Sequence, residues 1–334
     1  QPFLARSSSL FLSFLLFPFL PVNDGTQVAS LSEEYPKTVS PHYPVVIDTY
    51  DANGTPVQTT FQRAPQRIIV DEVNALETLL ILGQGERIVG AALSTSGVSY
   101  ARLQCEYPEE FAKVEPVIQN SIGREQAVAL QPDFILAWKA SFTPRWYGNT
   151  AWWQERGVNT YVIATANHVL KDATVEDECK FIDDMGRIFD RKAQTDALLQ
   201  DIRAELHVDE ATMRGREQQT VLVVEVGEGD ILNYDEGWVV GDMVRRLGGR
   251  IPLTSKYIGE EELISCDPDV IFVTYNDAYG KQFAENFFRA VRFNSLRAVQ
   301  NDRIHFVPVE YVYTPAFKIL DGIRAIRRGL YPDE

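Results

Sequence analysis

Short apolar runs alternate along the chain with segments whose apolar residues recur every three or four positions. Between residues 67 and 92 this pattern predicts a strand at 67–70, a helix at 74–83 that ends on a glycine, and a second strand at 87–92. A strand, a helix and a strand in this order form a β-α-β unit, which implies a parallel sheet with a right-handed crossover. The pattern therefore indicates an α/β protein.

The same alternation continues to residue 164, and a hairpin precedes it. Residues 44–61 alternate with period two around Asn53-Gly54, which predicts a β-hairpin at an edge of the fold. Residues 175–213 contain only a helical pattern and no strand candidate. The remaining elements expected before it are helices at 125–131 and 149–157 and strands at 133–138 and 160–164.

A second series of strands and helices follows residue 213. It contains strand patterns at 218–226, 269–274 and 303–308, and helical patterns at 238–249, 261–265, 287–299 and 315–332. The order of elements in this half matches the order in the first half. We therefore expect a duplicated α/β lobe.

One segment occurs twice in closely related form. "EQAVALQPDFILAW" covers residues 125–138 and "EELISCDPDVIFVT" covers 261–274, and in each a glutamate precedes Pro-Asp by seven positions and a strand follows. Solenoid repeats have periods of about 20 to 50 residues, so a spacing of 136 residues (261 minus 125) indicates two similar domains. The predicted fold is α/β, with two similar Rossmann-like lobes of mostly parallel sheets, one long connecting helix and a ligand cleft between the lobes. The expected boundaries are 43–190 for the N-terminal lobe, 191–213 for the linker helix and 214–334 for the C-terminal lobe.

The N-terminal region is predicted to be a targeting segment. An apolar run of eleven residues at 10–20 follows Arg6, and small residues at 27–30 suit cleavage. The run is shorter than the roughly 20 residues that span a bilayer as a helix. We expect a signal peptide at 1–30 and a polar N-terminal extension at 31–42, with a buried N-terminal helix as the alternative.

Composition and charge exclude several classes of function. The formal charge is -15, from 32 basic and 47 acidic residues, and no window is strongly basic, which argues against nucleic-acid binding. The acidic balance is compatible with a partner that presents Arg or Lys, or with a cationic or metal-bearing ligand. The three cysteines are widely spaced and form no metal-binding pair. No catalytic motif is present, so we expect no enzyme activity.

Taken together, the motifs of the chain resemble one family of transport proteins. They look like those of the solute-binding proteins that serve ABC importers of iron-siderophores, haem and cobalamin. The motifs are "PQRIIV" (65–70), "ETLLILGQGERIVGA" (77–91), "GREQAVALQPDFILAW" (123–138), "KAQTDALLQDIRAEL" (192–206), "LGG" (247–249), "DPDVIFVT" (267–274), "LRAVQNDRIHFVP" (296–308) and "ILDGIRAIRRGLYP" (319–332). The resemblance spans roughly residues 43–333 and implies a two-lobed binding protein that delivers a metal chelate to a membrane permease.

In that family a surface glutamate on each lobe docks onto arginines of the permease. The motif positions here are Glu125 and Glu261. Each opens the first turn of a predicted helix, where the helix dipole favours a carboxylate, and charge-assisted pairs with a basic partner would add orientation. The alternative for each residue is a helix-capping acid without a partner.

The ligand cleft is predicted from the strand ends, because ligands of open α/β sheets bind beyond the carboxyl ends of the strands. The aromatic residues suit stacking on a macrocycle or a catecholate, and Arg145 suits the negative charge of a ferric siderophore or a haem propionate. A neutral histidine at a strand end is a possible ligand of haem iron or cobalt. The candidate ligand-binding residues are Asn74, Trp138, Arg145, Trp146, His168, Trp238, Tyr275 and Tyr311.

The expected function is therefore capture of an iron complex, a ferric siderophore or haem, and its delivery to the permease of an ABC importer. We expect a monomer located in the periplasm or at the cell surface, with no permanent cofactor, no resident metal and the iron complex as its ligand. Two alternatives stay open. One is a cobalamin-binding protein of the same transporter class, and the other is a chelatase-like tetrapyrrole enzyme on the same two-lobed plan.

Overall fold

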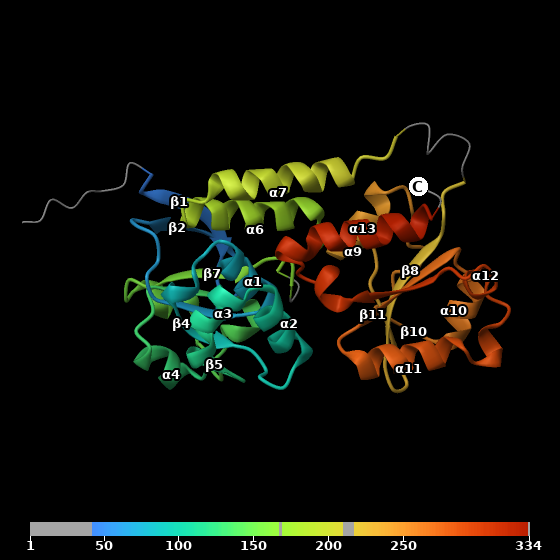
Figure 1. Ribbon diagram of the computed structural model, residues 1–334, viewed down its shortest axis with the longest axis horizontal. Coiled ribbons are helices and arrows are strands. Elements are labelled where there is room, and N and C mark those ends of the chain that lie inside the picture. Colours follow the sequence, from blue (N-terminus) through green and yellow to red (C-terminus); the bar gives the residue numbers. More distant parts are fainter. Residues whose placement is uncertain (1–41, 167–168, 210–216, 333–334) are drawn as a thin grey trace, which may run out of the picture. The chain divides into compact units, whose positions relative to one another are not determined.

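The computed structural model describes residues 42–166, 169–209 and 217–332. All of them belong to one compact unit that extends from Ser40 to Glu334. The predicted signal peptide and nearly all of the predicted extension lie outside the described residues. The predicted lobe boundaries remain a prediction, whereas the two sheets on which they rest are present (Figure 1).

The first sheet has five parallel strands in the order β5-β4-β3-β6-β7. This order confirms the predicted β-α-β units. After β3, the next two strands in sequence are added on one side of it, whereas β6 and β7 are added on the other side. The strand order therefore reverses between β3 and β6, the position at which α/β sheets bind ligands. The elements are β3 (Ile68–Asp71), α1 (Val73–Ile81), β4 (Ile88–Ala92), α2 (Val98–Glu106), α3 (Pro108–Val114), β5 (Ile118–Gln119), α4 (Arg124–Ala129), β6 (Phe134–Trp138), α5 (Thr150–Gln154) and β7 (Asn159–Ile163).

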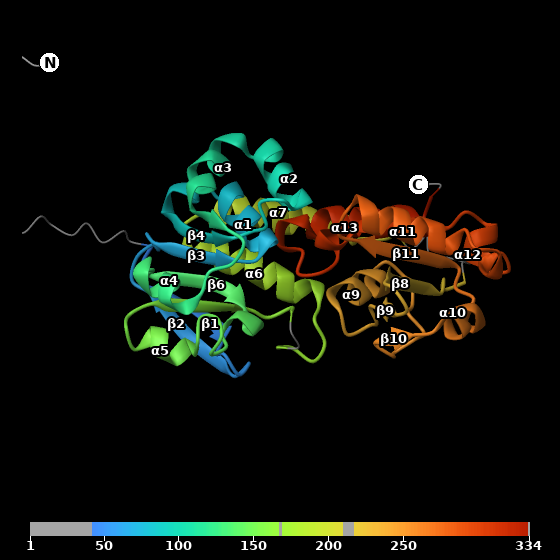
Figure 2. The same ribbon diagram turned by 90° about the horizontal axis from the view of Figure 1, so that it is seen from below.

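Helices cover both faces of this sheet. Figure 2 shows α1, α2 and α3 on one side and α4 and α5 on the other. Side chains alternate between the two faces of β3, so that Ile68 and Val70 join one apolar cluster and Ile69 joins the other. A strand buried on both faces has no polar positions, which explains why the sequence shows an apolar run instead of an alternating pattern.

The predicted hairpin is confirmed as a separate two-stranded antiparallel sheet of β1 (Val45–Tyr50) and β2 (Pro56–Phe61). Its turn contains Gly54 with a φ of 85°, a conformation that glycine adopts at little cost. Asp51 accepts hydrogen bonds from the backbone N–H groups of Asn53 and Thr55, both at 2.8 Å.

The second sheet has the order β10-β9-β8-β11-β12, which is the positional order of the first sheet. β8, β11 and β12 are parallel, whereas β9 is antiparallel to both of its neighbours, so the sheet is mostly parallel as predicted. The elements are β8 (Val221–Val226), β9 (Ile231–Asn233), α9 (Val239–Arg246), β10 (Tyr257–Ile258), α10 (Glu260–Cys266), β11 (Val270–Tyr275), α11 (Ala278–Phe288), α12 (Arg297–Gln300), β12 (Ile304–Pro308) and α13 (Ile319–Leu330).

The helical stretch expected at 175–213 is divided into two helices, α6 (Val175–Ile188) and α7 (Lys192–Glu205), which pack side by side (Figure 1). The break lies where the expected N-terminal lobe (43–190) meets the expected linker helix (191–213), because Asp190 adopts a φ of 53° and ends α6. Arg191 N–H then donates to the Gly186 carbonyl at 2.7 Å, the 6→1 bond of a Schellman motif. Helical periodicity alone does not reveal such a stop, since both helices keep an apolar face.

Close packing of α6 on α7 depends on Gly186. A Cβ atom at this position would lie 2.1 Å from Thr195 Oγ1, so the two helices approach there more closely than a side chain permits. At its other end α7 contacts α13, with Glu205 paired to Arg324 at 3.2 Å. This helix therefore contacts elements from both halves of the chain.

The sequence also predicted a helix at 287–299, and this was wrong. α11 ends at Phe288 and α12 begins only at Arg297, because Ala290 and Leu296 have extended backbone angles. Aromatic rings of Phe287, Phe288 and Phe293 cluster between them, with the 287–293 centroids 4.7 Å apart. The apolar residues of this segment recur at helical spacing, and this is why a helix was predicted there. The short 3-10 helices are η1 (Gly85–Arg87), η2 (Glu115–Val117), η3 (Lys139–Ser141), η4 (Val291–Phe293), η5 (Val309–Tyr311) and η6 (Ala316–Lys318).

Two general properties concern the described part of the chain. None of its helices combines the length and the apolar character needed to cross a membrane. All three cysteines are free, with Cys179 buried and Cys105 exposed.

Candidate functional site: a cavity at the strand ends

A cavity of about 900 Å³ lies among the carboxyl-end residues of both sheets. Its size is that of a site for a drug-sized or larger ligand. The side chains that line it and matter most below are Asn74, Arg102, Trp138, Glu225, Trp238 and Glu310.

Strand ends place these side chains. β3 stops at Asp71, after which Glu72 and Asn74 begin α1, and β6 stops at Trp138. In the second sheet, Glu225 lies near the end of β8 and Tyr275 ends β11. Each pair belongs to the two adjacent strands at which the order of its sheet reverses, as expected for ligand sites of α/β sheets.

Aromatic rings form one wall of the cavity. Tyr313 lies between Trp138 and Trp238, with ring centroids 6.1 Å and 5.6 Å away, and Tyr234 continues the row 5.2 Å from Trp238. Trp138 Nε1 has no hydrogen-bond partner among the described residues, although the atom is buried. Such a row offers flat apolar faces and one spare indole donor to a ligand.

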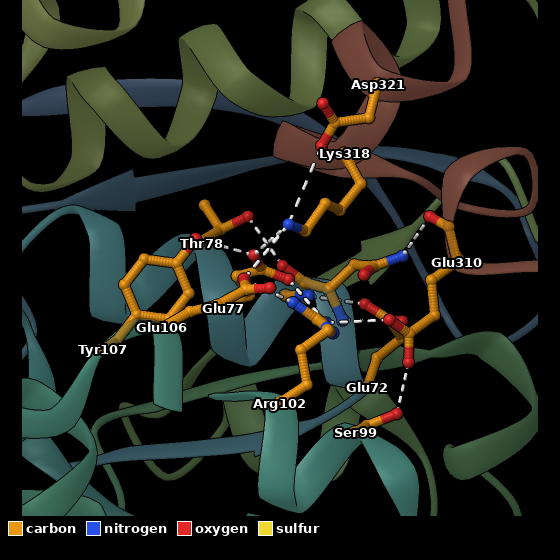
Figure 3. A network of polar contacts seen from close by, with 12 residues as sticks. Glu72, Glu77, Thr78, Ser99, Arg102, Glu106, Tyr107, Glu310, Lys318 and Asp321 are labelled. Carbon is orange, nitrogen blue, oxygen red and sulfur yellow. Dashed lines mark hydrogen bonds and ion pairs between the residues drawn. The ribbon is translucent and has the colours of Figure 1, made fainter. Parts of the chain in front are cut away.

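A polar network forms the floor and joins segments far apart in sequence (Figure 3). Glu310 pairs with Arg102 at 2.8 Å and accepts a hydrogen bond from Ser99 Oγ. Arg102 also pairs with Glu77 at 2.8 Å, and Lys318 reaches Glu77 at 3.2 Å. Bases in the network are thus already neutralised by protein carboxylates.

Asn74 adds an uncharged link between the two halves of the chain. Its Nδ2 donates to the carbonyl oxygens of Glu310 at 3.1 Å and Thr314 at 3.0 Å. Its Oδ1 is buried without a partner among the described residues. Because both amide protons serve the backbone of the second half, Asn74 positions the cavity floor.

Glu72 is the most strongly perturbed acid at the cavity. Its carboxylate accepts from the backbone N–H groups of Asn74 at 2.9 Å and Ala75 at 2.5 Å, which caps α1. Complete burial raises its pKa from the ordinary 4.5 to about 8, and the nearby carboxylates of Glu178 and Glu310 act in the same direction. Glu72 is therefore mainly protonated at neutral pH.

Four of the eight candidate ligand-binding residues line this cavity, namely Asn74, Trp138, Trp238 and Tyr275. Tyr311 does not. It lies on η5 beside the polar network, where burial raises its pKa and Asp321 adds to the effect. His168 lies outside the described residues.

Arg145 and Trp146 are also absent from the lining. The segment after β6 folds back in a tight turn, in which the N–H groups of Trp146 and Gly148 donate to the Thr143 carbonyl. Tyr147 is fully buried and holds this turn against the core, which leaves the Arg145 guanidinium over the Trp146 ring at 5.1 Å. Both residues lie too far beyond the end of β6 for the position of the strand end to predict where they point.

Sequence reasoning missed several charged residues of the cavity, among them Arg102 and Glu225. Arg102 lies on α2, a helix that the apolar pattern did not predict because only Leu103 of its residues is buried. Glu225 did leave a signal, since it is the only charged residue in the apolar strand Val221–Val226. A lone carboxylate in such a strand needs a polar environment.

The duplicated segment has the same backbone in both halves. Gly123 and Gly259 precede α4 and α10 with nearly equal angles, φ/ψ of -82°/167° and -88°/167°. This register places Glu125 and Glu261 at the second position of their helices, and both are exposed. Neither forms a hydrogen bond or ion pair with the described residues, whereas Glu260 pairs with Arg292 at 2.5 Å.

The Pro-Asp that follows has a structural role. Asp133 accepts from the backbone N–H groups of Gln66 and Arg67 just before β3, and Asp269 accepts from Thr220 N–H just before β8. Each aspartate therefore joins the starts of two adjacent parallel strands. This pairing explains the repeat without any ligand.

The described residues contain no group of three or more His, Cys, Asp or Glu side chains arranged to hold a metal ion. The arrangement instead provides aromatic faces, amide and indole groups and carboxylates. Such groups bind a ligand noncovalently.

Comparisons with known proteins agree with this geometry. The family model described as periplasmic binding protein matches residues 68–311. The uncharacterized ABC transporter substrate-binding lipoprotein YvrC of Bacillus subtilis (strain 168) is 22% identical over 309 residues, which is 87% of each chain. A periplasmic binding protein from Veillonella parvula DSM 2008 is 26% identical, with a TM-score of 0.79 over 87% of this chain and 92% of that one. A structure from Saccharomonospora viridis DSM 43017, described as an ABC-type Fe3+-hydroxamate transport system, is 21% identical, with a TM-score of 0.64 over 86% of this chain and 99% of that one.

Proposed function

The chain belongs to the periplasmic binding protein family, and on that premise we propose that it captures an iron complex and delivers it to the permease of an ABC importer. The observation that carries this proposal is the cavity of about 900 Å³ with its aromatic wall at the ends of both sheets. No covalent step is involved, because a binding protein acts through its affinity for the ligand and its recognition by the permease.

A ferric siderophore or haem is the proposed cargo, and capture takes place outside the cytoplasmic membrane. Two features of relatives support this choice: the Saccharomonospora structure bears an Fe3+-hydroxamate transport name, and the Bacillus relative is described as an ABC transporter lipoprotein. Cobalamin is the alternative cargo. The aromatic wall suits the flat rings of haem and cobalamin and the apolar faces of a ferric siderophore.

Docking to the permease is proposed through Glu125 and Glu261. β5 and β6 are parallel, so α4 between them runs back from the carboxyl edge of the first sheet and starts at that edge. By the same reasoning α10, between β10 and β11, starts at the carboxyl edge of the second sheet. Both free carboxylates thus lie toward the edge at which ligand binds, one in each half, and suit basic partners on a permease.

Tryptophan fluorescence tests the proposal directly. Ferric hydroxamate, ferric catecholate, haem and cyanocobalamin are titrated into the protein, and we expect at least one to quench emission saturably because Trp138 and Trp238 line the cavity. Trp138→Phe should remove much of the quenching and weaken affinity on the order of tenfold, since it shortens an aromatic wall.

The matched control is Trp152→Phe. Trp152 lies outside the cavity lining, and the guanidinium groups of Arg124 and Arg156 lie over its ring. Its loss should leave affinity unchanged. Absence of binding across the whole panel, or equal effects of the two substitutions, contradicts the proposal, and metal insertion into added porphyrin would favour the chelatase-like alternative.

A further inference from the structure

The cavity is lined by both basic and acidic side chains, and these differ in whether they are already paired inside the protein. Among the described residues, its lining carries three basic residues, Arg102, Lys256 and Lys281, and four acidic ones. The acidic residues are Glu72, Glu225, Asp277 and Glu310, and Glu72 adds no charge while it is protonated. What matters for a ligand is which of these already have partners inside the protein.

Both terminal nitrogens of Arg102, the one arginine among the described lining residues, pair with carboxylates, whereas its buried Nε has no hydrogen-bond partner among the described residues. Arg102 pairs with Glu77 at 2.8 Å, with Glu106 at 3.0 Å and with Glu310 at 2.8 Å. Its guanidinium therefore faces three carboxylates, and these surroundings raise its pKa further. An anionic ligand would have to displace protein carboxylates from this arginine, at a cost in buried ion pairs.

The network around Arg102 also has an excess of acid. Arg102 and Lys318 are its two bases, and they contact four carboxylates, those of Glu77, Glu106, Glu310 and Asp321 (Figure 3). The floor of the cavity therefore presents a negative potential to a ligand. An anion placed there is repelled and a cation is attracted.

Glu225 is the lining carboxylate best placed to pair with a cationic group of a ligand. It accepts hydrogen bonds from Tyr234 Oη at 2.8 Å and Asn276 Nδ2 at 3.0 Å, and both donors are neutral. No basic side chain pairs with it among the described residues. A cationic group of a ligand could therefore pair with Glu225 beside the rings of Tyr234 and Trp238, which also attract cations.

The two lysines do not reverse this balance. Lys281 has its Nζ 3.8 Å from Glu285 and 5.8 Å from the centroid of the Tyr275 ring. Lys256 is exposed, and its Nζ lies 5.5 Å from the centroid of the Tyr257 ring. Exposed charges are weakened by solvent and salt, so these two contribute less than charges on the cavity floor.

We infer that the cavity selects a chelate of zero or positive net charge with a flat or apolar face, and discriminates against anionic chelates such as ferric catecholates and haem. The inference rests on the proposed function and narrows its cargo. Arg145, the residue that suits an anionic ligand, lies outside the cavity lining.

A charge series on one scaffold tests the inference. Ferrioxamine B is a ferric trihydroxamate with a pendant ammonium, its N-acetyl derivative is neutral, and its N-succinyl derivative is anionic. Affinities measured by calorimetry at low ionic strength should be at least tenfold higher for the cationic than for the anionic member, with the neutral member between them. Ferric catecholate, haem and neutral cyanocobalamin complete the panel.

The substitution Glu225→Gln tests whether the preference for cationic chelates arises in the cavity. This substitution keeps the shape of the side chain and removes its charge, so the preference for the cationic over the neutral member should fall severalfold while binding of the neutral member persists. Glu109→Gln is the control, because Glu109 is exposed on α3 and lies outside the lining. It should leave the preference unchanged.

The outcomes separate this inference from the proposed function. Binding of neutral or cationic chelates only, including cyanocobalamin alone, supports it. If haem, ferric catecholate or the succinyl derivative binds as tightly as the neutral chelates or more tightly, the charge inference is overturned while the proposed function stands. If no chelate of the panel binds, both are overturned.

Discussion

At the scale of single residues, Glu72 connects helix capping, burial and the cavity. Its carboxyl caps α1 and lines the cavity, and burial raises its pKa to about 8. In the unfolded chain its pKa is near the ordinary 4.5. Between these values the folded protein holds a proton that the unfolded chain releases, so the stability linked to Glu72 is present at low pH and is lost as pH rises toward about 8.

Glu72→Gln should remove this dependence, since the amide does not titrate. Relative to the variant, the wild-type protein should lose on the order of a few kcal/mol of unfolding free energy between about pH 5 and about pH 8. Urea denaturation at both pH values measures it, with the exposed Glu109→Gln on α3 as control. Glu178, whose pKa burial raises to about 7, is present in all three proteins and cancels in the comparison. Parallel profiles for wild type and Glu72→Gln would contradict the assignment.

The sequence was enough to predict part of the cavity lining. Trp138 and Tyr275 end buried strands, and a parallel sheet brings such ends to one edge, so the sequence was enough to place them. The positions of Arg102 and Arg145 could not be predicted from the sequence. The position of Arg102 depends on a helix with one buried residue, and that of Arg145 depends on a turn fixed by buried Tyr147, and neither leaves a periodic pattern.

At the scale of elements, the repeated segment builds the same helix and strand twice. Gly123 and Gly259 give α4 and α10 the same start, and Asp133 and Asp269 join adjacent strands. The sequence predicted these elements because short apolar strands and glycine-bounded helices are local features. It wrongly predicted one helix at 287–299, because the extended backbone of Ala290 and Leu296 leaves no periodic signal.

The exposed glutamates of α4 and α10, Glu125 and Glu261, allow the proposed docking to be tested. Changing both to Arg should reduce chelate uptake by cells at least tenfold, because two exposed carboxylates proposed to meet a basic permease surface become cations. Chelate affinity, measured by calorimetry, should not change. The control is Glu109→Arg with Glu155→Arg, which alters net charge equally at two other exposed glutamates. Uptake that survives, or affinity that falls with it, counts against the proposed docking.

At the scale of the described chain, contacts between distant segments set the geometry of the cavity. Glu178 accepts from the N–H of Ala316 at 2.8 Å, and Asn74 donates to the Thr314 carbonyl at 3.0 Å. Thr314 and Ala316 both have positive φ, at 41° and 46°. Non-glycine residues rarely adopt this conformation, and each such residue costs on the order of 1 kcal/mol or more. The bonds from Asn74 and Glu178 hold this strained segment beside the cavity, which accounts for its place in the lining.

The central claim is that one chelate occupies this cavity and touches both halves of the chain. Hydrogen–deuterium exchange with and without the tightest-binding chelate of the panel tests it most directly. The account predicts slower exchange at residues 72–74 and 97–102 of the first half and at 275–278 and 308–314 of the second, all of which include cavity-lining positions. Slower exchange confined to one half, or located away from these segments, would contradict it.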